Sequence, residues 1–318
     1  MYVDSTSGTR FGYACINMTL GKQGITTNRS CVKKTWLGKG IQHVSKLALI
    51  NCGALLKVVE WNRDHGVQVF RMTSCLFPWH SEYALEDLPD WPEIRSLLEA
   101  VGKTAEASNQ RLSFHPGQHN VLSSPREQVV ENAIIDLRAH SDIMDAIGLP
   151  RTPGAKINLH VGGAYGEHAK ALERLCRVFE TRLPEGVRSR LTLENDDKPG
   201  MFSTRMLYEG VYKRVGIPIV FDSHHFECGP QDSTYEEALA MAVDSWPEGV
   251  RPQCHHTNSR RDHEDPKVSR VAHSDWYYTP FRDLGHSVDV VLECKMKEVA
   301  LEKYRQDFLS AYTEERVS

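Results

Sequence analysis

The segment LTLEND at residues 191–196 is a short apolar run that ends in the polar side chains of Glu194, Asn195 and Asp196. Each of five further segments is an apolar run leading to a histidine or a carboxylate: RLSFHPGQH (111–119), INLHVGG (157–163), IPIVFDSHH (217–225), RPQCHHTN (251–258) and VDVVLECK (288–295). Such short runs, rich in β-branched residues, are typical of buried strands. In a parallel barrel all strands end at one mouth, so we expect these polar side chains to converge there.

Strand and helix candidates alternate along the chain. Apolar runs at 11–16 and 67–74 bring the predicted strands to eight, and stretches with helical periodicity, such as 40–63, 91–109 and 296–312, follow most of them. Alternation predicts a parallel sheet, and eight repeats predict its closure. The predicted fold is therefore α/β, a single-domain (β/α)8 TIM barrel over residues 1–318 with its core at about 10–312.

Two connections after strand ends are unusually long, residues 17–39 and residues 259–286. We call them the first loop and the second loop. Connections of this length without clear secondary structure are usually functional or mobile. Because both follow strand ends, both are expected at the rim of the same mouth as the polar side chains.

Bulk composition is that of a globular protein. The 318 residues are 40% hydrophobic and 25% charged, and no apolar run approaches the ~20 residues that span a bilayer. The eight cysteines are scattered and form no CxxC pair, which predicts reduced thiols and a cytoplasmic location.

Charge is distributed unevenly, although the net charge is only −4. No acidic residue occurs between Asp4 and Glu60, but this stretch holds eight basic ones: Arg10, Lys22, Arg29, Lys33, Lys34, Lys39, Lys46 and Lys57. The rest of the chain is correspondingly acidic, as a site for several cations would be. A basic lobe beside such a site suits a polyanionic substrate, and the alternative is a solvated surface on which charges happen to cluster.

The histidines and carboxylates at the strand ends predict metal binding as a group. A single histidine at a strand end is more often a hydrogen-bonded structural residue than a ligand. Buried imidazoles and carboxylates without partners would each cost several kcal/mol, on the order of 2–7, which divalent ions would offset. Three histidines and three carboxylates exceed the needs of one tetrahedral ion, so two or three ions are expected.

Several motifs also resemble those of the UV damage endonucleases, which are related in fold to endonuclease IV and to xylose-isomerase-like barrels. The resemblance runs in order over residues 10–302 and rests on RFGYACINMTL, FRMTSCLFP, SFHPGQHNVLSS, INLHVGGAYG, LTLENDDK, VFDSHH, AHSDWY and VVLECKMKEVAL. It implies a metal-dependent DNA repair endonuclease with two to three divalent ions, Mn²⁺ in preference to Zn²⁺ or Mg²⁺.

The resemblance also implies roles for individual residues. The implied metal ligands are His115, His160, Glu194, Asp222, His225, His256, His273 and Glu293. Glu194 is the expected bridging carboxylate, and Glu194, His115 and Lys198 form the expected catalytic set, with Lys198 as a candidate phosphate contact. His255 and His256 both stand in position on the seventh strand. His256 is favoured because His256-Thr257-Asn258 resembles the His-x-Asn run of endonuclease IV, and His224 is expected to be a neighbour of the ligands.

Three positions depart from the family pattern. Where the family has a histidine after the second strand, this chain reads LFPWHSEY, so His80 or Glu82 is the candidate replacement. A lysine commonly lies two positions before the histidine of the seventh strand, and here that position is Cys254 or Gln253. The aromatic residue after the His-Pro-Gly-Gln run is replaced by His119.

Recognition of damage is implied at Tyr13, Gln118 and His119, which would fill the gap left when a poorly stacked nucleotide is extruded. The alternative for Tyr13 is an aromatic residue packed under the first loop. Candidate phosphate contacts are the basic residues at 22–39 and, in the second loop, Arg260, Arg261, Lys267 and Arg270.

The predicted function is incision of damaged double-stranded DNA on the 5′ side of UV photoproducts, leaving a 3′-hydroxyl and a 5′-phosphate, with abasic sites as a second lesion class. The protein is expected to act as a monomer without membrane contact. Three alternatives remain: an abasic-site endonuclease of the endonuclease IV type, a metal-dependent sugar isomerase of the same barrel superfamily, and a catalytically inactive barrel that binds DNA.

Overall fold

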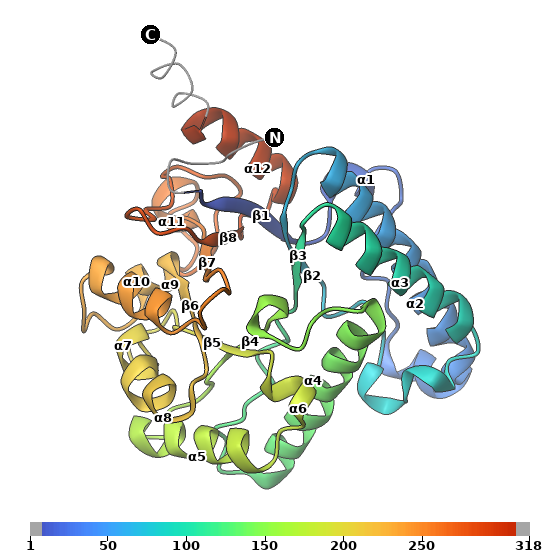
Figure 1. Ribbon diagram of the computed structural model, residues 1–318, viewed down its shortest axis with the longest axis horizontal. Coiled ribbons are helices and arrows are strands. Elements are labelled where there is room, and N and C mark those ends of the chain that lie inside the picture. Colours follow the sequence, from blue (N-terminus) through green and yellow to red (C-terminus); the bar gives the residue numbers. More distant parts are fainter. Residues whose placement is uncertain (1–7, 310–318) are drawn as a thin grey trace.

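The computed structural model describes residues 8–309, and within them eight parallel strands form one sheet around a central axis (Figure 1). The order is β3-β2-β1-β8-β7-β6-β5-β4. A bridge between Phe114 and Ile157 joins the ends of this order, since Phe114 N–H donates to Lys156 O at 2.9 Å and Asn158 N–H donates to Phe114 O at 3.0 Å. The strands are β1 (Arg10–Cys15), β2 (Val69–Met72), β3 (Arg111–Ser113), β4 (Ile157–His160), β5 (Leu191–Glu194), β6 (Ile219–Asp222), β7 (Gln253–His256) and β8 (Asp289–Leu292). The predicted (β/α)8 barrel is confirmed.

Helices surround the strands in Figure 1. The longer ones are α2 (Lys33–Asp64), α3 (Trp91–Ala107), α4 (Glu127–Ile147), α5 (His168–Thr181), α10 (Tyr235–Asp244) and α12 (Lys297–Tyr304). Short segments are α1 (Met18–Gly21), η1 (His80–Glu82), η2 (Leu85–Asp87), η3 (Pro153–Ala155), α6 (Glu185–Arg188), α7 (Thr204–Leu207), η4 (Tyr208–Tyr212), α8 (Lys213–Val215), α9 (Ser223–Cys228), α11 (Arg260–His263) and η5 (Arg305–Leu309). Among residues 8–309 no helix is long and apolar enough to cross a bilayer.

The first predicted helix corresponds to α2 but begins later than α2 does. It was expected at 40–63, but α2 begins at Lys33 and is interrupted at Gly40, whose φ of 63° is not helical. Glycine adopts this conformation without steric cost, so one helical segment can follow another at an angle. The first loop therefore contains α1 and the first turns of α2. The second loop contains α11, and the predicted end of the last helix, 310–312, lies outside the described residues.

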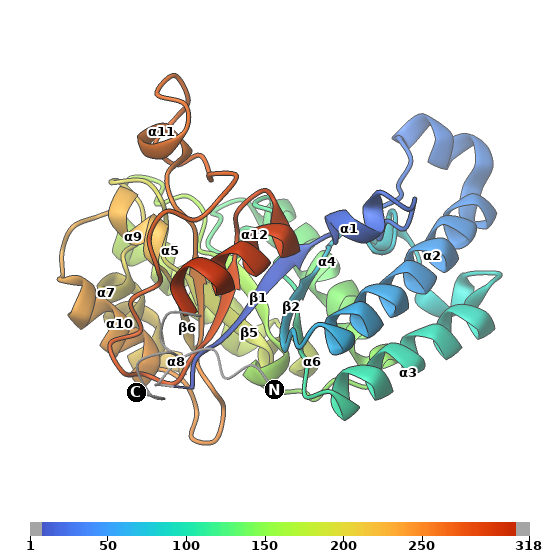
Figure 2. The same cartoon turned by 90° about the horizontal axis from the view of Figure 1, so that it is seen from above.

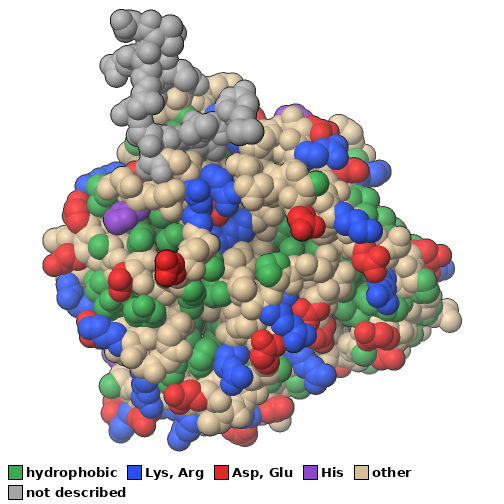
Figure 3. Space-filling model, viewed as in Figure 1, with side chains coloured by type: hydrophobic (Ala, Val, Ile, Leu, Met, Phe, Trp, Pro, Cys, Tyr) green, Lys and Arg blue, Asp and Glu red, His purple; other side chains and the backbone are tan. Residues whose placement is uncertain are grey.

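Both loops project beyond the strand ends. Figure 2 shows α11 and the beginning of α2 rising on the same side of the barrel, one at each edge. The face shown in Figure 3, viewed as in Figure 1, carries interspersed acidic and basic side chains.

Charged side chains close the barrel at the strand starts. Asp289, at the beginning of β8, is fully buried. Arg10 donates to both of its carboxylate oxygens at 2.7 Å, and Arg111 donates to Oδ2 at 3.0 Å. The Arg251 guanidinium lies 3.7 Å from Oδ1. These contacts join four segments of the chain below the apolar core.

Candidate metal centre

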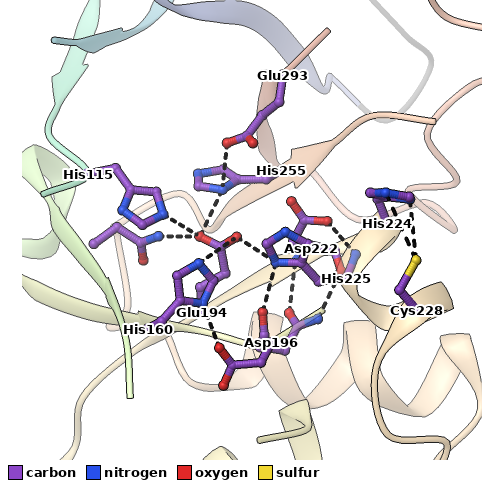
Figure 4. Close-up of polar contacts among 12 residues, drawn as sticks. His115, His160, Glu194, Asp196, Asp222, His224, His225, Cys228, His255 and Glu293 are labelled. Atoms are coloured by element: carbon purple, nitrogen blue, oxygen red, sulfur yellow. Dashed lines mark hydrogen bonds and ion pairs between the residues drawn. The ribbon is translucent and has the colours of Figure 1, made fainter. Parts of the chain in front are cut away.

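Glu194, at the end of β5, lies at the centre of a group of imidazoles inside the mouth of the barrel (Figure 4). Its side chain is 1% exposed. The ring nitrogens that face its carboxylate are His255 Nδ1 at 3.0 Å, His225 Nδ1 at 3.1 Å, His115 Nε2 at 3.3 Å and His160 Nε2 at 3.9 Å. A carboxylate enclosed in this way has the ligand chemistry to bridge divalent ions held by the surrounding imidazoles.

Two more carboxylates extend the group. Asp222 ends β6, and Glu293 follows β8 with one oxygen 3.2 Å from His255 Nδ1 and the other 3.6 Å from His273 Nδ1. Three sets of donors have ligand atoms within 4.8 Å of one another: His115, His160 and Glu194; Glu194, Asp222 and His225; and Asp222, His255 and Glu293. Adjoining sets share Glu194 or Asp222, so the structure brings most of the predicted ligands together, with His273 at the edge.

The turn after β6 explains how His225 reaches Glu194. Asp222 caps α9 by accepting the backbone N–H of His225 at 2.8 Å, which directs the first turn of α9 back toward β5. Asn195 then joins the two strand ends, because its side chain accepts from Asp222 N–H at 2.9 Å and donates to Asp222 O at 3.0 Å. The His225 ring also lies with Nδ1 3.0 Å from Asn195 O.

The preference for His256 over His255 is wrong in this structure. His255 is the residue that faces Glu194 and Glu293, whereas His256 lies on the opposite side of β7. Both His256 nitrogens are occupied, Nδ1 by Ser223 Oγ at 2.7 Å and Nε2 by Thr279 O at 3.0 Å, and the ring stacks on Tyr277. Successive side chains of a strand point to opposite faces, so only one of two adjacent histidines can enter the barrel.

Several buried side-chain atoms that could ligate a metal ion have no hydrogen-bond partner. They are Asp222 Oδ2, His160 Nδ1 and His255 Nδ1. Each of the two nitrogens lies close to a carboxylate oxygen, His160 Nδ1 at 3.1 Å from Asp196 and His255 Nδ1 at 3.0 Å from Glu194, but without hydrogen-bond geometry. Buried polar atoms are normally satisfied. Divalent ions need nitrogen and oxygen ligand atoms that converge and are free of other partners. The residues present therefore fit such ions.

Protonation differs among the imidazoles. Burial alone would raise the pKa of Glu194, but the surrounding histidines, His255 first, hold it well below its usual range. Burial lowers the pKa of His115 to about 4, which leaves its ring neutral. Burial acts in the same direction on His225, but Asp222 and Glu194 outweigh it and raise its pKa well above the usual value, and Glu194 and Asp196 likewise raise the pKa of His160. The ion-free site is therefore partly charged by protons that an ion would displace.

Polar residues that sequence reasoning missed lie below this group. Asn158 Nδ2 donates to Glu194 Oε2, and Arg71 of β2 pairs with Glu293. Lys156 is fully buried with Nζ 3.2 Å from His255 Nε2, and burial lowers its pKa well below the usual value. The sequence carried a signal for Lys156 and Asn158. Residues two apart on a strand share a face, so both should lie on the same side as His160.

Lys156 also concerns the position two residues before the histidine of the seventh strand, where the family commonly has a lysine. Since His255 is the residue inside the barrel, the position two residues before it is Gln253, not Cys254. Gln253 is fully buried, and neither of its side-chain amide atoms has a hydrogen-bond partner. In this chain a buried lysine side chain, that of Lys156 directly before β4, lies against the His255 ring instead.

Tyr13 does not occupy the lesion-probing position predicted for it. It is fully buried, its hydroxyl donates to Asn62 Oδ1 at 2.7 Å and accepts from Asn17 Nδ2 at 2.9 Å, and its ring packs against Phe70. Tyr13 instead matches the alternative, an aromatic residue packed beneath the first loop. Gln118 and His119 are exposed at the tip of a turn after β3.

The candidate replacements after the second strand lie outside the group around Glu194. His80 Nε2 is 2.8 Å from Asp136 Oδ1 on α4, and the Glu82 side chain is exposed. His224 is fully buried and lies beside Cys228, with its ring against that of His273. Position therefore makes His224 a neighbour of the ligands, as expected.

An open cavity of about 330 Å³ lies against the imidazole group. Gln118, His160, Asp196, Lys198 and His225 are among the residues that line it. Lys198 is exposed. The cavity therefore connects the candidate metal ligands with the residues predicted to contact a phosphate and a damaged nucleotide.

Comparisons with known proteins identify relatives of the whole chain. The family model described as UV-endonuclease UvdE matches residues 9–316. A UV-damage endonuclease of Schizosaccharomyces pombe is 33% identical over 308 residues, which cover 92% of this chain and 49% of the relative. A putative UV-damage endonuclease of Acanthamoeba polyphaga mimivirus is 28% identical over 305 residues, covering 92% of this chain and 89% of the relative.

Solved structures agree with these relatives. The crystal structure of SacUVDE superimposes with a TM-score of 0.79 and 26% sequence identity, covering 94% of this chain and 98% of the other. Endonuclease IV from Thermus thermophilus superimposes with a TM-score of 0.55 and 16% identity, covering 96% and 99% of the two chains. The second likeness concerns the barrel fold.

Proposed function

The chain belongs to the UV-endonuclease UvdE family, and from this premise we propose that it is a metal-dependent DNA repair endonuclease. The proposed reaction is hydrolysis of the phosphodiester on the 5′ side of a UV photoproduct, which leaves a 3′-hydroxyl and a 5′-phosphate. Because the chain spans only about half the length of its relative in Schizosaccharomyces pombe, activity, substrate and partners are all part of this proposal.

The enclosure of Glu194 by four imidazoles, with Asp222 and Glu293 beside it, is the observation that carries the proposal. Two to three divalent ions bound there, Mn²⁺ foremost, would provide an activated water and neutralise charge on the phosphoryl oxygens. The residues proposed to hold them are His115, His160, Glu194, Asp222, His225, His255, His273 and Glu293.

The chain's own residues would orient the phosphodiester. Lys198 at the cavity is the proposed phosphate contact, and Glu194 is the proposed bridging carboxylate. Asn158 fixes the Glu194 carboxylate by donating to Oε2. Lys156 holds the His255 ring through Nε2, which leaves Nδ1 directed at Glu194 and Glu293. Such outer partners orient metal ligands and commonly contribute about 10- to 100-fold in affinity or activity.

Damaged double-stranded DNA is the proposed partner, bound between the two loops that rise at the mouth (Figure 2). Exposed basic residues on both loops are the candidate phosphate contacts: Lys22, Arg29, Lys33, Lys34, Lys39, Arg261, Lys267 and Arg270. A small neutral sugar would need none of these charges. Affinity for DNA should fall steeply with salt concentration, and a flat response would remove these residues from the interface.

Gln118 and His119 are the proposed probes of the lesion, since both are exposed on a turn next to the cavity. We expect Gln118→Ala to weaken binding to a lesion duplex more than binding to an undamaged duplex. An equal loss on both duplexes would contradict a probing role.

The protein is proposed to act as a monomer in the cytoplasm. All the donors that meet around Glu194 and Asp222 come from one chain, which supports action as a monomer. All eight cysteines are free thiols, which suits a reducing compartment.

Plasmid nicking tests the proposed function. The protein, stripped of metal and then supplied with Mn²⁺, should nick UV-irradiated supercoiled DNA and leave undamaged DNA intact, while Glu194→Ala should nick neither. Equal nicking of both plasmids, or activity in Glu194→Ala, would overturn the proposal. A plasmid with abasic sites measures the second lesion class, and preference for it over the irradiated plasmid would favour an abasic-site endonuclease.

A further inference from the structure

A buried polar network outside the candidate metal centre supports the turn formed by residues 117–120, which we call the probing turn. Asn120, 2% exposed, closes this turn because its backbone N–H and its side-chain Nδ2 each donate to Gly117 O at 3.1 Å. Gln118 and His119 at the tip are exposed. Asn120 is therefore the buried end of the segment proposed to test the DNA.

Asp136 of α4 holds Asn120 from below. Its Oδ2 accepts the second Nδ2 hydrogen of Asn120 at 2.8 Å, and its Oδ1 lies 2.8 Å from Nε2 of His80 in η1. The carboxylate is only 13% exposed. One side chain thus connects the probing turn, α4 and the segment that follows β2.

Both ring nitrogens of His80 face oxygen atoms. Nδ1 lies 3.0 Å from Phe77 O, which can only accept, and Nε2 lies 2.8 Å from the Asp136 carboxylate. Burial would raise the pKa of Asp136, but the hydrogen bond from His80, with the other histidine and Asn120, lowers it to about 2.

The η1 end of the network is itself fixed. Trp79, directly before His80, donates from Nε1 to Cys31 O at 3.0 Å and stacks on Trp36. Cys31 and Trp36 flank the exposed Lys33 and Lys34 of the first loop. The network therefore extends from the probing turn to the base of a proposed phosphate-contacting loop.

We propose that Asp136 is a positioning residue for damage recognition: through Asn120 and His80 it holds the probing turn in the orientation that presents Gln118 and His119 to DNA. This proposal rests on the proposed function. Because the network touches the turn and not the donors around Glu194, it should affect selective binding and leave the chemical step unchanged.

Three variants and one control test this. Asp136→Ala removes both contacts and should weaken binding to a photoproduct-containing duplex about tenfold or more, equivalent to about 1.4 kcal/mol. Asn120→Ala should do the same, and the double variant should be no worse than either single one, since they break one connection. Binding to undamaged duplex and kcat at saturating substrate should stay within about twofold, as should all properties of Asp142→Ala, an exposed carboxylate on the same helix.

Asp136→Asn distinguishes hydrogen bonding from metal binding. Its oxygen can still accept from Asn120 and its amide can donate to a neutral His80, so it should retain wild-type discrimination. His80, Asp136 and His140 also have donor atoms within 4.8 Å of one another, as an ion site would. Loss of one bound ion per chain in Asp136→Asn, with loss of discrimination, would overturn the proposal in favour of a metal site.

Equal weakening on damaged and undamaged duplexes, or a fall in kcat with unchanged binding, would also overturn the proposal. Thermal unfolding shows whether Asp136→Ala is folded. If it is not, the binding of Asn120→Ala to damaged and undamaged duplexes tests the proposal. Failure of the proposed function itself is separate, because it appears as wild-type protein that does not distinguish irradiated from undamaged plasmid.

Discussion

The two ends of the barrel each hold a buried carboxylate surrounded by nitrogen-containing side chains, but these side chains differ. At the strand starts, Asp289 is paired with guanidiniums, which stay charged at every accessible pH and hydrogen-bond both of its oxygens. At the mouth, Glu194 faces imidazoles, which can release their protons, and several donors beside it have no hydrogen-bond partner. The first arrangement is complete within the protein, whereas the second leaves buried nitrogen and oxygen atoms without a hydrogen-bond partner.

The largest expected effect comes from removing the charge at the mouth. Glu194→Gln should lower UV-dependent nicking by more than about 100-fold, because outer partners of metal ligands alone contribute about 10- to 100-fold. Folding should persist, since the amide is nearly the same size. Activity is measured by plasmid nicking and folding by circular dichroism. Wild-type activity in this variant would place the chemistry elsewhere.

Removing the carboxylate at the other end should affect stability instead. Asp289→Ala leaves three guanidiniums without their buried counter-charge and should lower the free energy of unfolding by about 3–5 kcal/mol. Chemical denaturation measures this loss. Nicking per folded molecule should stay close to wild type, and a selective loss of activity at full folding would show that the two ends are not independent.

The adjacent histidines of β7 give the same contrast at smaller scale. His255→Ala should lower the number of bound ions, whereas His256→Ala should keep the ions and lower the free energy of unfolding by about 2–3 kcal/mol through lost packing and hydrogen bonds. Elemental analysis and denaturation separate the two. The reverse pattern would restore His256 as the ligand.

The smallest expected effect is on pH dependence. The raised pKa values of His160 and His225 mean that, without an ion, these rings keep their protons to a higher pH than a free imidazole, and ion binding must release them. Metal affinity should therefore increase as pH rises through and above the usual range of an imidazole, with release of protons on binding. Calorimetry in buffers of different ionisation enthalpy measures this release. His115, with a pKa of about 4, contributes no proton.

The barrel and most of the candidate ligands were predictable because short apolar runs ending in His, Asp or Glu mark both the strands and their C-terminal ends. His255 and His256 were harder to separate, since the side of a strand that faces inward depends on register. Tyr13 was misassigned because a residue near a strand end can turn its ring under a loop, and nothing in the sequence reveals its hydrogen bonds to Asn17 and Asn62. Lys156 was missed because a lysine rarely lies fully inside a barrel.

The number of divalent ions per chain tests the central claim most directly. Protein stripped of metal, incubated with Mn²⁺ and freed of excess ion is measured by elemental analysis beside Glu194→Gln. The site around Glu194 should hold two or three ions per wild-type chain and fewer in the variant. Wild-type protein without bound Mn²⁺, or a variant that binds as many ions as wild type, would contradict a metal centre at this mouth.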